Sequence, residues 1–171
     1  MAVIDLSQVP SFFHRYINQV RQTDIREALT VHEKEFTQFL KTIPEDKWNY
    51  RYEEGKWSIK EMVQHIIDAE RIFAFRALTF AREDRNALPG FDENDYARVA
   101  PAGQRSKEDL IEELAIVQRS TILLFNSFGE KQLDAFGTAN GNKIQVKALG
   151  FVIIGHTLHH KMILQERYLA N

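Results

Sequence analysis

Residues 150–169 limit the fold more than any other stretch, because they form the longest apolar run of the chain and still carry three of its six histidines. A helix turns by about 100° per residue, so His156 and His160 lie on one side of it, within an apolar stripe. A second apolar stripe lies roughly opposite: Phe151, Ile154, Leu158 and Met162. Because a helix that is apolar nearly all round is buried on both sides, we expect both stripes to be covered.

Four stretches have the apolar periodicity of long helices: about 23–43, 58–81, 106–128 and 145–169. The clearest start is a capping box, in which the Ser58 hydroxyl caps the backbone N–H of Glu61 and the Glu61 carboxylate reaches back. Thr23 or Asp24 is the expected N-cap of the first helix, and Pro44 lies just beyond its end. These signals predict helices that begin and end at defined residues.

The four helices, with no strand-rich region, predict an all-α protein. We expect a four-helix bundle of the up-down-down-up type, formed by a single domain over residues 1–171. A shorter helix is expected over 12–21, and a small hairpin within 129–144. A long loop, residues 83–105, separates the second and third long helices, and loops of this length are often lids or binding loops. Its apolar residues 88–91 either fold over a cavity or merely cover the core.

The composition excludes several classes of partner and site. Lysine and arginine number 22 against 24 acidic residues, a net charge of −2, which favours neither nucleic acid nor an anionic membrane surface. No apolar run is long enough to span a bilayer, and we expect no secretion signal, because the N-terminus lacks a basic segment followed by an apolar stretch. The absence of cysteine excludes disulfides, thiolate nucleophiles and cysteine-type zinc sites. We expect a soluble cytoplasmic protein with a small-molecule substrate.

Histidine spacing indicates a metal site. His156 and His160 are one helical turn apart, so both can bind one ion, which would satisfy two imidazoles that otherwise have few partners in an apolar core. Helical bundles take metal ligands from facing helices, and His65 lies in the helix over 58–81. We therefore predict that these three histidines bind a divalent transition metal: imidazole suits zinc, nickel, copper and iron, and of these we expect zinc or nickel. His32 is either a core histidine or a further group of the metal site.

Two carboxylates near His65 are candidates for a catalytic role. Glu61 lies one turn before His65 on the same helix, and Asp68 lies about one turn after it. Either could act as the general base of a hydrolysis or could orient His65. The alternative is that both are surface carboxylates on the solvated side of the helix.

The second apolar stripe of the last helix needs a covering. The N-terminal segment, the loop over 83–105 and a second subunit could each supply it. We favour a homodimer.

Several motifs carry a resemblance to a known family: GKWSIKEMVQHIIDAER at 55–71, LPGFD at 88–92, GTANG at 137–141 and GHTLHH at 155–160. With these motifs the sequence resembles the DinB-like superfamily, which includes the bacillithiol S-transferases and the mycothiol-dependent maleylpyruvate isomerases. The resemblance implies a four-helix bundle, commonly dimeric, whose metal is held by His65, His156 and His160. His159 then lies outside the ligand set.

The expected chemistry follows from the neutral ligands. An ion held by three imidazoles keeps its charge and lowers the pKa of a bound water or thiol. The expected protein is a metal-dependent enzyme acting on a small molecule, as a thiol S-transferase or a hydrolase. Because the chain has no cysteine, a thiol has to come from a low-molecular-weight thiol cosubstrate. Two alternatives stay open: a metal-binding stress-response protein without catalysis, and a bundle whose histidines are only structural.

Overall fold

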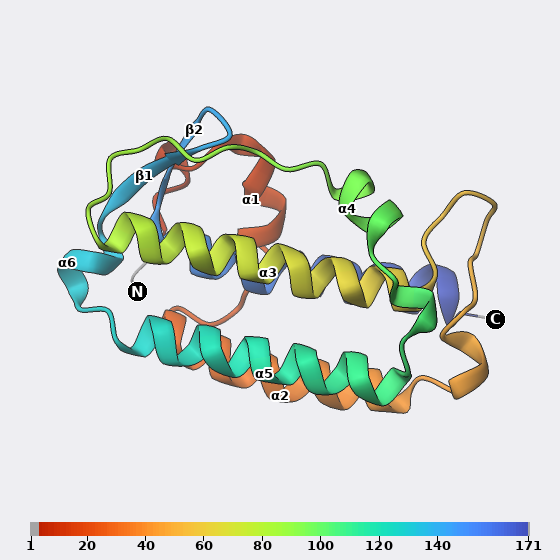
Figure 1. Cartoon of the computed structure of the whole chain (residues 1–171). Coiled ribbons are helices and arrows are strands. Elements are labelled where there is room, and N and C mark those ends of the chain that lie inside the picture. The colour runs from red at the N-terminus through yellow and green to blue at the C-terminus, as the bar shows by residue number, and fades with distance from the viewer. Residues whose placement is uncertain (1–3, 171) are drawn as a thin grey trace.

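The computed structural model describes residues 4–170 and is built around four long helices (Figure 1). They are α2 (Ile25–Thr42), α3 (Ile59–Ala81), α5 (Lys107–Asn126) and α7 (Val146–Ile163), the last continued by a π-helical turn at Leu164–Tyr168. The shorter elements are α1 (Ser11–Ile17), α4 (Glu93–Val99), α6 (Glu130–Leu133) and 3-10 helices at Leu6–Gln8, Glu45–Lys47 and Ala102–Gln104. The expected all-α four-helix bundle is confirmed.

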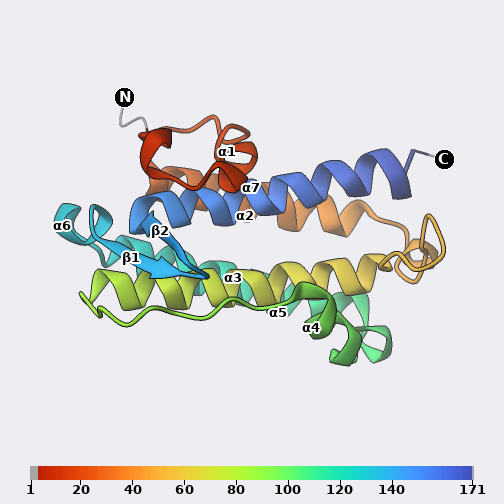
Figure 2. The same cartoon turned by 90° about the horizontal axis from the view of Figure 1, so that it is seen from above.

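The long helices follow the up-down-down-up order that the sequence predicted. α2 and α3 are antiparallel, α5 runs in the same direction as α3, and α7 returns alongside α2 (Figure 1). Each of α3 and α2 packs against both α5 and α7. Since two parallel helices cannot be joined by a short turn, the chain runs back along α3 through residues 82–106, which we call the crossover segment (Figure 2).

Side-chain caps fix where the long helices start. Asp24 accepts hydrogen bonds from the backbone N–H groups of Arg26 and Glu27 at the start of α2. Ser58 and Glu61 form the predicted capping box of α3. Each cap satisfies backbone N–H groups that have no partner inside the helix, which stabilises the helix by about 1 kcal/mol.

The crossover segment differs from the loop that we expected over 83–105, because it contains α4 and a 3-10 helix. Asp92 caps α4 by accepting hydrogen bonds from the backbone N–H groups of Asn94 and Asp95, a local signal like that of the long helices. The helix expected over 12–21 is also shorter, since α1 ends at Ile17. Beyond it the backbone N–H groups of Gln19 and Val20 bond only three positions back, to the carbonyls of Tyr16 and Ile17, which tightens the turn into the approach to α2.

The expected hairpin is present and fastens the crossover segment to the bundle. Strands β1 (Phe136–Ala139) and β2 (Asn142–Gln145) are antiparallel and are joined by Asn140 and Gly141, whose positive φ angles of 50° and 71° suit a tight hairpin turn. Leu88 of the crossover segment adds to β1: its N–H donates to the Thr138 carbonyl at 2.9 Å, and its carbonyl accepts from the Asn140 N–H at 3.0 Å.

Two apolar clusters fill the bundle, one around Leu29, Phe80 and Ile153 and the other around Leu40, Ile66 and Leu114. Buried polar residues lie where one cluster gives way to the other along the long helices: His32, His65, Glu70, Gln118, Thr121, His156 and His160. The core therefore has a polar layer across its middle, and the candidate metal ligands belong to it.

The second apolar stripe of α7 is covered mainly within the chain. Phe151 and Ile154 are buried, and α1 packs against α7 (Figure 2). Met162, near the end of the stripe, is 42% exposed. Of the three coverings that we considered, the N-terminal segment is the one found, so this stripe does not by itself require a second subunit.

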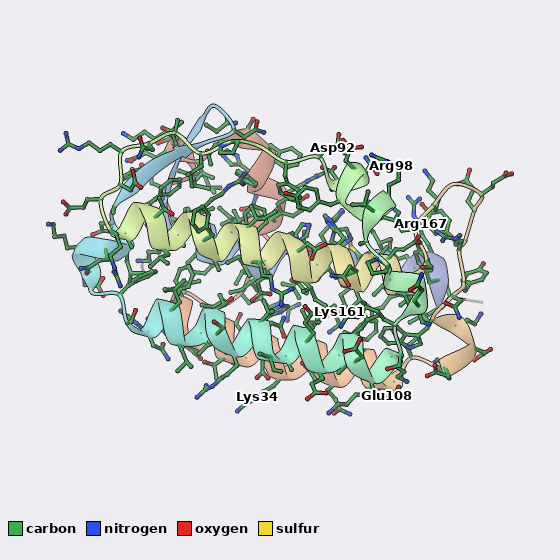
Figure 3. The ribbon with its side chains drawn as sticks, in the orientation of Figure 1. Lys34, Asp92, Arg98, Glu108, Lys161 and Arg167 are labelled. Atoms are coloured by element: carbon green, nitrogen blue, oxygen red, sulfur yellow. The ribbon has the colours of Figure 1, made fainter. Side chains whose placement is uncertain are left out.

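No helix within residues 4–170 combines the length and the apolar character that crossing a membrane demands. Many charged side chains are exposed and point away from the bundle, as Lys34, Arg98 and Glu108 do in Figure 3. Lys161 on α7 is different, because it is half-buried and its Nζ lies 5.3 Å from the centre of the Phe39 ring on α2.

Candidate metal centre

The three predicted histidines come together on the facing sides of two helices. His65 lies in the second turn of α3, whereas His156 and His160 lie one turn apart on α7. The two helices pack directly against each other, and all three side chains are buried. Each histidine contributes one ring nitrogen to a group in which these atoms lie within 4.8 Å of one another.

The geometry of the ring nitrogens suits a metal ion better than hydrogen bonds. His156 Nε2 lies 3.0 Å from His65 Nε2 and 3.1 Å from His160 Nε2. A neutral imidazole nitrogen carries either one hydrogen or one lone pair, so His156 Nε2 cannot make a good hydrogen bond to both neighbours at once. Three lone pairs directed at one ion would satisfy all three nitrogens, as in zinc sites with three protein ligands.

Electrostatics keeps these imidazoles neutral. Burial lowers the pKa of His65 to about 4. Burial also lowers the pKa of His156 and His160 far below the ordinary value, and repulsion among the histidines lowers it further. Their lone pairs are therefore available at neutral pH, which metal binding requires.

Aromatic rings hold two of the histidines in place. The Trp57 ring centre lies 4.8 Å from that of His65, and Tyr16 of α1 meets the His156 ring edge-on at 5.6 Å. His160 Nδ1 is buried without a hydrogen-bond partner among the described residues. The rings thus support the site mainly through packing.

A cavity of about 390 Å³ borders the three histidines. Its walls are largely aromatic: Phe12, Phe13, Tyr16, Trp57, Phe73 and Phe91. Arg15, Arg76 and Glu93 supply its charged groups. A volume of this order suits a small organic molecule. The part of α1 in this wall was not predicted from the sequence, although its cluster of aromatic residues at 12–16 was an available signal.

The two predicted carboxylates lie away from this cavity. Glu61 accepts hydrogen bonds from the Ser58 backbone N–H at 2.6 Å and from Arg51 Nη2 at 2.9 Å. Asp68 accepts from Gln64 Nε2 at 3.0 Å, and burial raises the pKa of its carboxyl group. Neither carboxylate lines the cavity of the three histidines or shares a hydrogen bond with them.

The remaining histidines of interest do not join the group. His32 is buried in α2 and stacks on Phe36 with ring centres 5.8 Å apart, and burial lowers its pKa to about 4. It is a core histidine. His159 lines the cavity beside His160, but its ring nitrogens are not among the three that converge.

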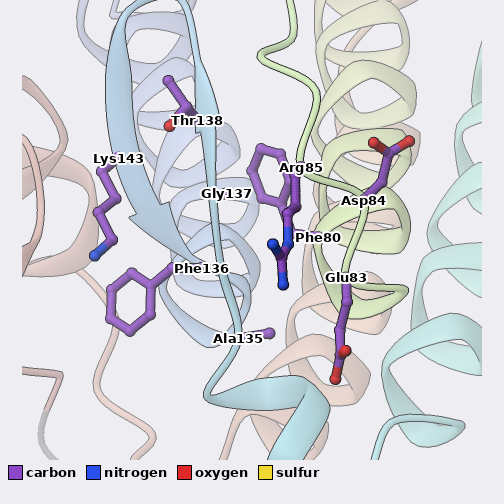
Figure 4. A pocket seen from close by; sticks show the side chains of 9 residues that line it. All are labelled: Phe80, Glu83, Asp84, Arg85, Ala135, Phe136, Gly137, Thr138 and Lys143. Carbon is purple, nitrogen blue, oxygen red and sulfur yellow. The ribbon is translucent and has the colours of Figure 1, made fainter.

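A second cavity, of about 360 Å³, is lined by the hairpin, the end of α3 and the start of the crossover segment (Figure 4). Lys143 and Phe136 line it from the strands, and Arg85 lines it from the crossover segment. Its two carboxylates already have partners, because Glu83 pairs with Lys131 at 2.6 Å and Asp84 accepts from the Asn86 N–H. It contains no histidine and has balanced charges, so we assign the candidate site to the first cavity.

Two proteins of similar fold or sequence are named as metal-dependent hydrolases. The chain is 26% identical over 149 residues to the "Putative metal-dependent hydrolase OB0413" of Oceanobacillus iheyensis, covering 86% of this chain and 80% of the relative. Its fold is similar to that of YfiT from Bacillus subtilis, described as a probable metal-dependent hydrolase with an unusual four-helix bundle topology; the TM-score is 0.75 at 14% identity, over 85% of each chain.

A DinB-like protein, YjoA from Bacillus subtilis, also has a similar fold, with a TM-score of 0.58 at 23% identity over 82% of this chain and 86% of that one. The family model of the DinB superfamily matches residues 28–164, a range that contains His65, His156 and His160. Motifs, fold and family model agree, and the chain belongs to the DinB superfamily.

Proposed function

We propose that this protein is a metal-dependent hydrolase that acts on a small organic molecule, with zinc or nickel bound by His65, His156 and His160. The observation that carries the proposal is the convergence of three buried, neutral imidazoles at the edge of a largely aromatic cavity. The descriptions of OB0413 and YfiT support the same reaction class.

A divalent ion held by three imidazoles would keep its full charge and favour the ionisation of a bound water. The chain itself keeps the imidazoles unprotonated by burying them, and its aromatic walls exclude bulk water from the substrate. Glu93 is the one carboxylate among the described lining residues, which makes it the best-placed proton acceptor. A role for Asp68 or Glu61 in positioning His65 along α3 stays a prediction.

The same site supports a second reaction, thiol S-transfer. The charge that ionises a bound water also ionises a bound thiol. Because the chain has no cysteine, that thiol would be a low-molecular-weight cosubstrate entering the cavity. A metal-binding protein without turnover is the remaining alternative.

Removal of the metal separates these functions. We expect protein purified without a histidine tag to hydrolyse some members of a panel of small esters and amides, to lose this activity after dialysis against a chelator, and to regain it with zinc or nickel. Circular dichroism checks that the metal-free protein stays folded. Turnover that requires an added thiol would indicate S-transfer. Bound metal without turnover would indicate a non-catalytic role. Protein that never binds metal would refute the proposal.

We also propose a homodimer, as the resemblance to the DinB-like superfamily implies. Large apolar side chains on α3, α4 and α5 offer surfaces for it: Phe75, Tyr96, Val99, Ile116 and Leu123. Light scattering at several protein concentrations should give the mass of two chains. The mass of one chain throughout would contradict the dimer.

A further inference from the structure

Arg76 is an arginine that is buried at the candidate cavity and has no counter-ion within residues 4–170. It projects from α3, is only 6% exposed, and lines the same cavity as the three histidines. Its Nη2 donates to the Pro89 carbonyl at 2.9 Å, but its Nε is buried without a partner. No carboxylate among the described residues lies within ion-pair distance of it. Buried charges are ordinarily paired, so this arginine calls for an explanation.

The surroundings of Arg76 stabilise a positive charge only weakly. The rings of Phe73 and Phe91 lie 5.8 and 6.0 Å from its guanidinium carbon, near the limit for a favourable interaction of a cation with an aromatic face. Burial lowers the pKa of Arg76, but an arginine stays charged at neutral pH because its pKa starts so high. A charged guanidinium with unused N–H groups therefore borders the cavity.

The charge balance of the cavity is positive. Arg15 of α1 also lines it; its Nη2 donates to the Tyr16 hydroxyl at 2.7 Å, and it too makes no ion pair with a described residue. The histidines are neutral, because their pKa values are lowered. Glu93, the single carboxylate among the described lining residues, is exposed and pairs with neither arginine. The cavity thus has two positive side chains against one negative side chain at its rim.

We propose that the cavity binds the carboxylate of a small organic acid, with Arg76 as its anchor and the aromatic walls packed around its apolar body. The inference rests on the proposed function, because it takes this cavity as the substrate site. The planar guanidinium presents paired N–H groups that match a carboxylate in two parallel hydrogen bonds. With the carboxylate at Arg76, the rest of the molecule extends along the walls toward the histidines.

A purely structural role explains less of the geometry. The bond to Pro89 holds the crossover segment against α3, but it uses only one of the five N–H groups of Arg76. The ammonium group of a lysine could donate the same hydrogen bond to Pro89, so this bond does not require an arginine. A bound carboxylate accounts for both the forked shape of the Arg76 guanidinium and its unpaired Nε.

The test compares phenylacetate with phenylacetamide, which has the same aromatic body and no charge, by calorimetric titration. We expect the wild-type protein to bind phenylacetate at least about tenfold more tightly than phenylacetamide, and Arg76→Gln to bind the two with equal affinity. Arg119→Gln is the matched control, since it removes the same charge from an exposed position on α5. Arg76→Lys keeps the charge but loses the forked guanidinium, so it should lose most of the preference for phenylacetate. If Arg76→Gln does not fold, Arg76→Lys provides the test in its place.

The same titration in His160→Ala separates this proposal from the metal proposal. A preference for phenylacetate that survives in that variant supports Arg76 as the anchor, whether or not the protein proves to be a hydrolase. Equal affinity for the acid and the amide, or no binding of phenylacetate, would overturn the inference. So would a preference that depends on His160 and not on Arg76, which would place the carboxylate on the histidine site. Tighter binding of phenyl phosphate than of phenylacetate would also overturn the inference, because it would indicate that Arg76 binds phosphate esters instead.

Discussion

Replacing His156 by alanine should leave the purified protein without bound metal and without hydrolase activity. His156 Nε2 is the central atom of the group, 3.0 Å from His65 Nε2 and 3.1 Å from His160 Nε2, so its loss removes the nitrogen that the other two share as a neighbour. Changes to groups that merely orient a ligand already cost about 10- to 100-fold in metal affinity, and loss of a ligand should cost more. Elemental analysis measures the metal, which should fall from about one ion per chain to none.

His159→Ala is the control for this experiment. His159 lines the same cavity and is adjacent to His160, but its nitrogens do not converge with the other three. Its replacement should leave the metal content unchanged. Equal metal in the His156→Ala and His159→Ala proteins would contradict the assignment of the ligands, and unfolding of His156→Ala would be visible in its circular dichroism.

Replacing Gly155 by alanine should strongly destabilise the protein. A methyl group added at Gly155 on α7 would lie 2.0 Å from the carbonyl oxygen of Tyr16 and 2.3 Å from its carbonyl carbon. These are backbone atoms of α1, which cannot rotate away as a side chain can, so α1 itself has to move. We expect a loss of about 3 kcal/mol in the free energy of unfolding, the upper part of the usual range for overpacking. Urea denaturation measures it.

The substitution should also disturb the cavity, because α1 carries Phe12, Arg15 and Tyr16 in its wall. Gly103→Ala is the matched control: a methyl group there meets no atom within 4 Å, and its effect should stay within about 0.5 kcal/mol. Similar urea midpoints for the two variants would show that α1 is not held as closely against α7 as the structure indicates.

Local signals made much of the fold predictable. Asp24, Ser58 and Ser106 cap helices through residues two or three positions away, so the sequence alone locates these starts. The pairing of His156 with His160 is equally local, because it depends only on helical spacing. We expected them to lie close to His65 because helical bundles take metal ligands from facing helices, and in the structure the ring nitrogens of the three histidines converge.

Contacts between distant segments were not predictable in the same way. No periodicity relates Tyr16 to Gly155 or Arg76 to Pro89, although these contacts place α1 and the crossover segment over the cavity. Glu61 illustrates a competition between two interpretations of one residue. Its spacing from His65 suggested catalysis, whereas its spacing from Ser58 indicated a cap, and the structure directs its carboxylate to the cap and to Arg51.

The parallel arrangement of α3 and α5 has a consequence for how such a chain can change during evolution. Antiparallel neighbours are joined by turns of about two to eight residues, whereas these two helices require a connection that travels the length of the bundle. Loop-closure entropy grows only with the logarithm of length, so a connection about five times longer costs roughly 1.4 kcal/mol more. Insertions there therefore cost little free energy, and the connecting segment can change the lining of the cavity while the four helices that position the histidines stay the same.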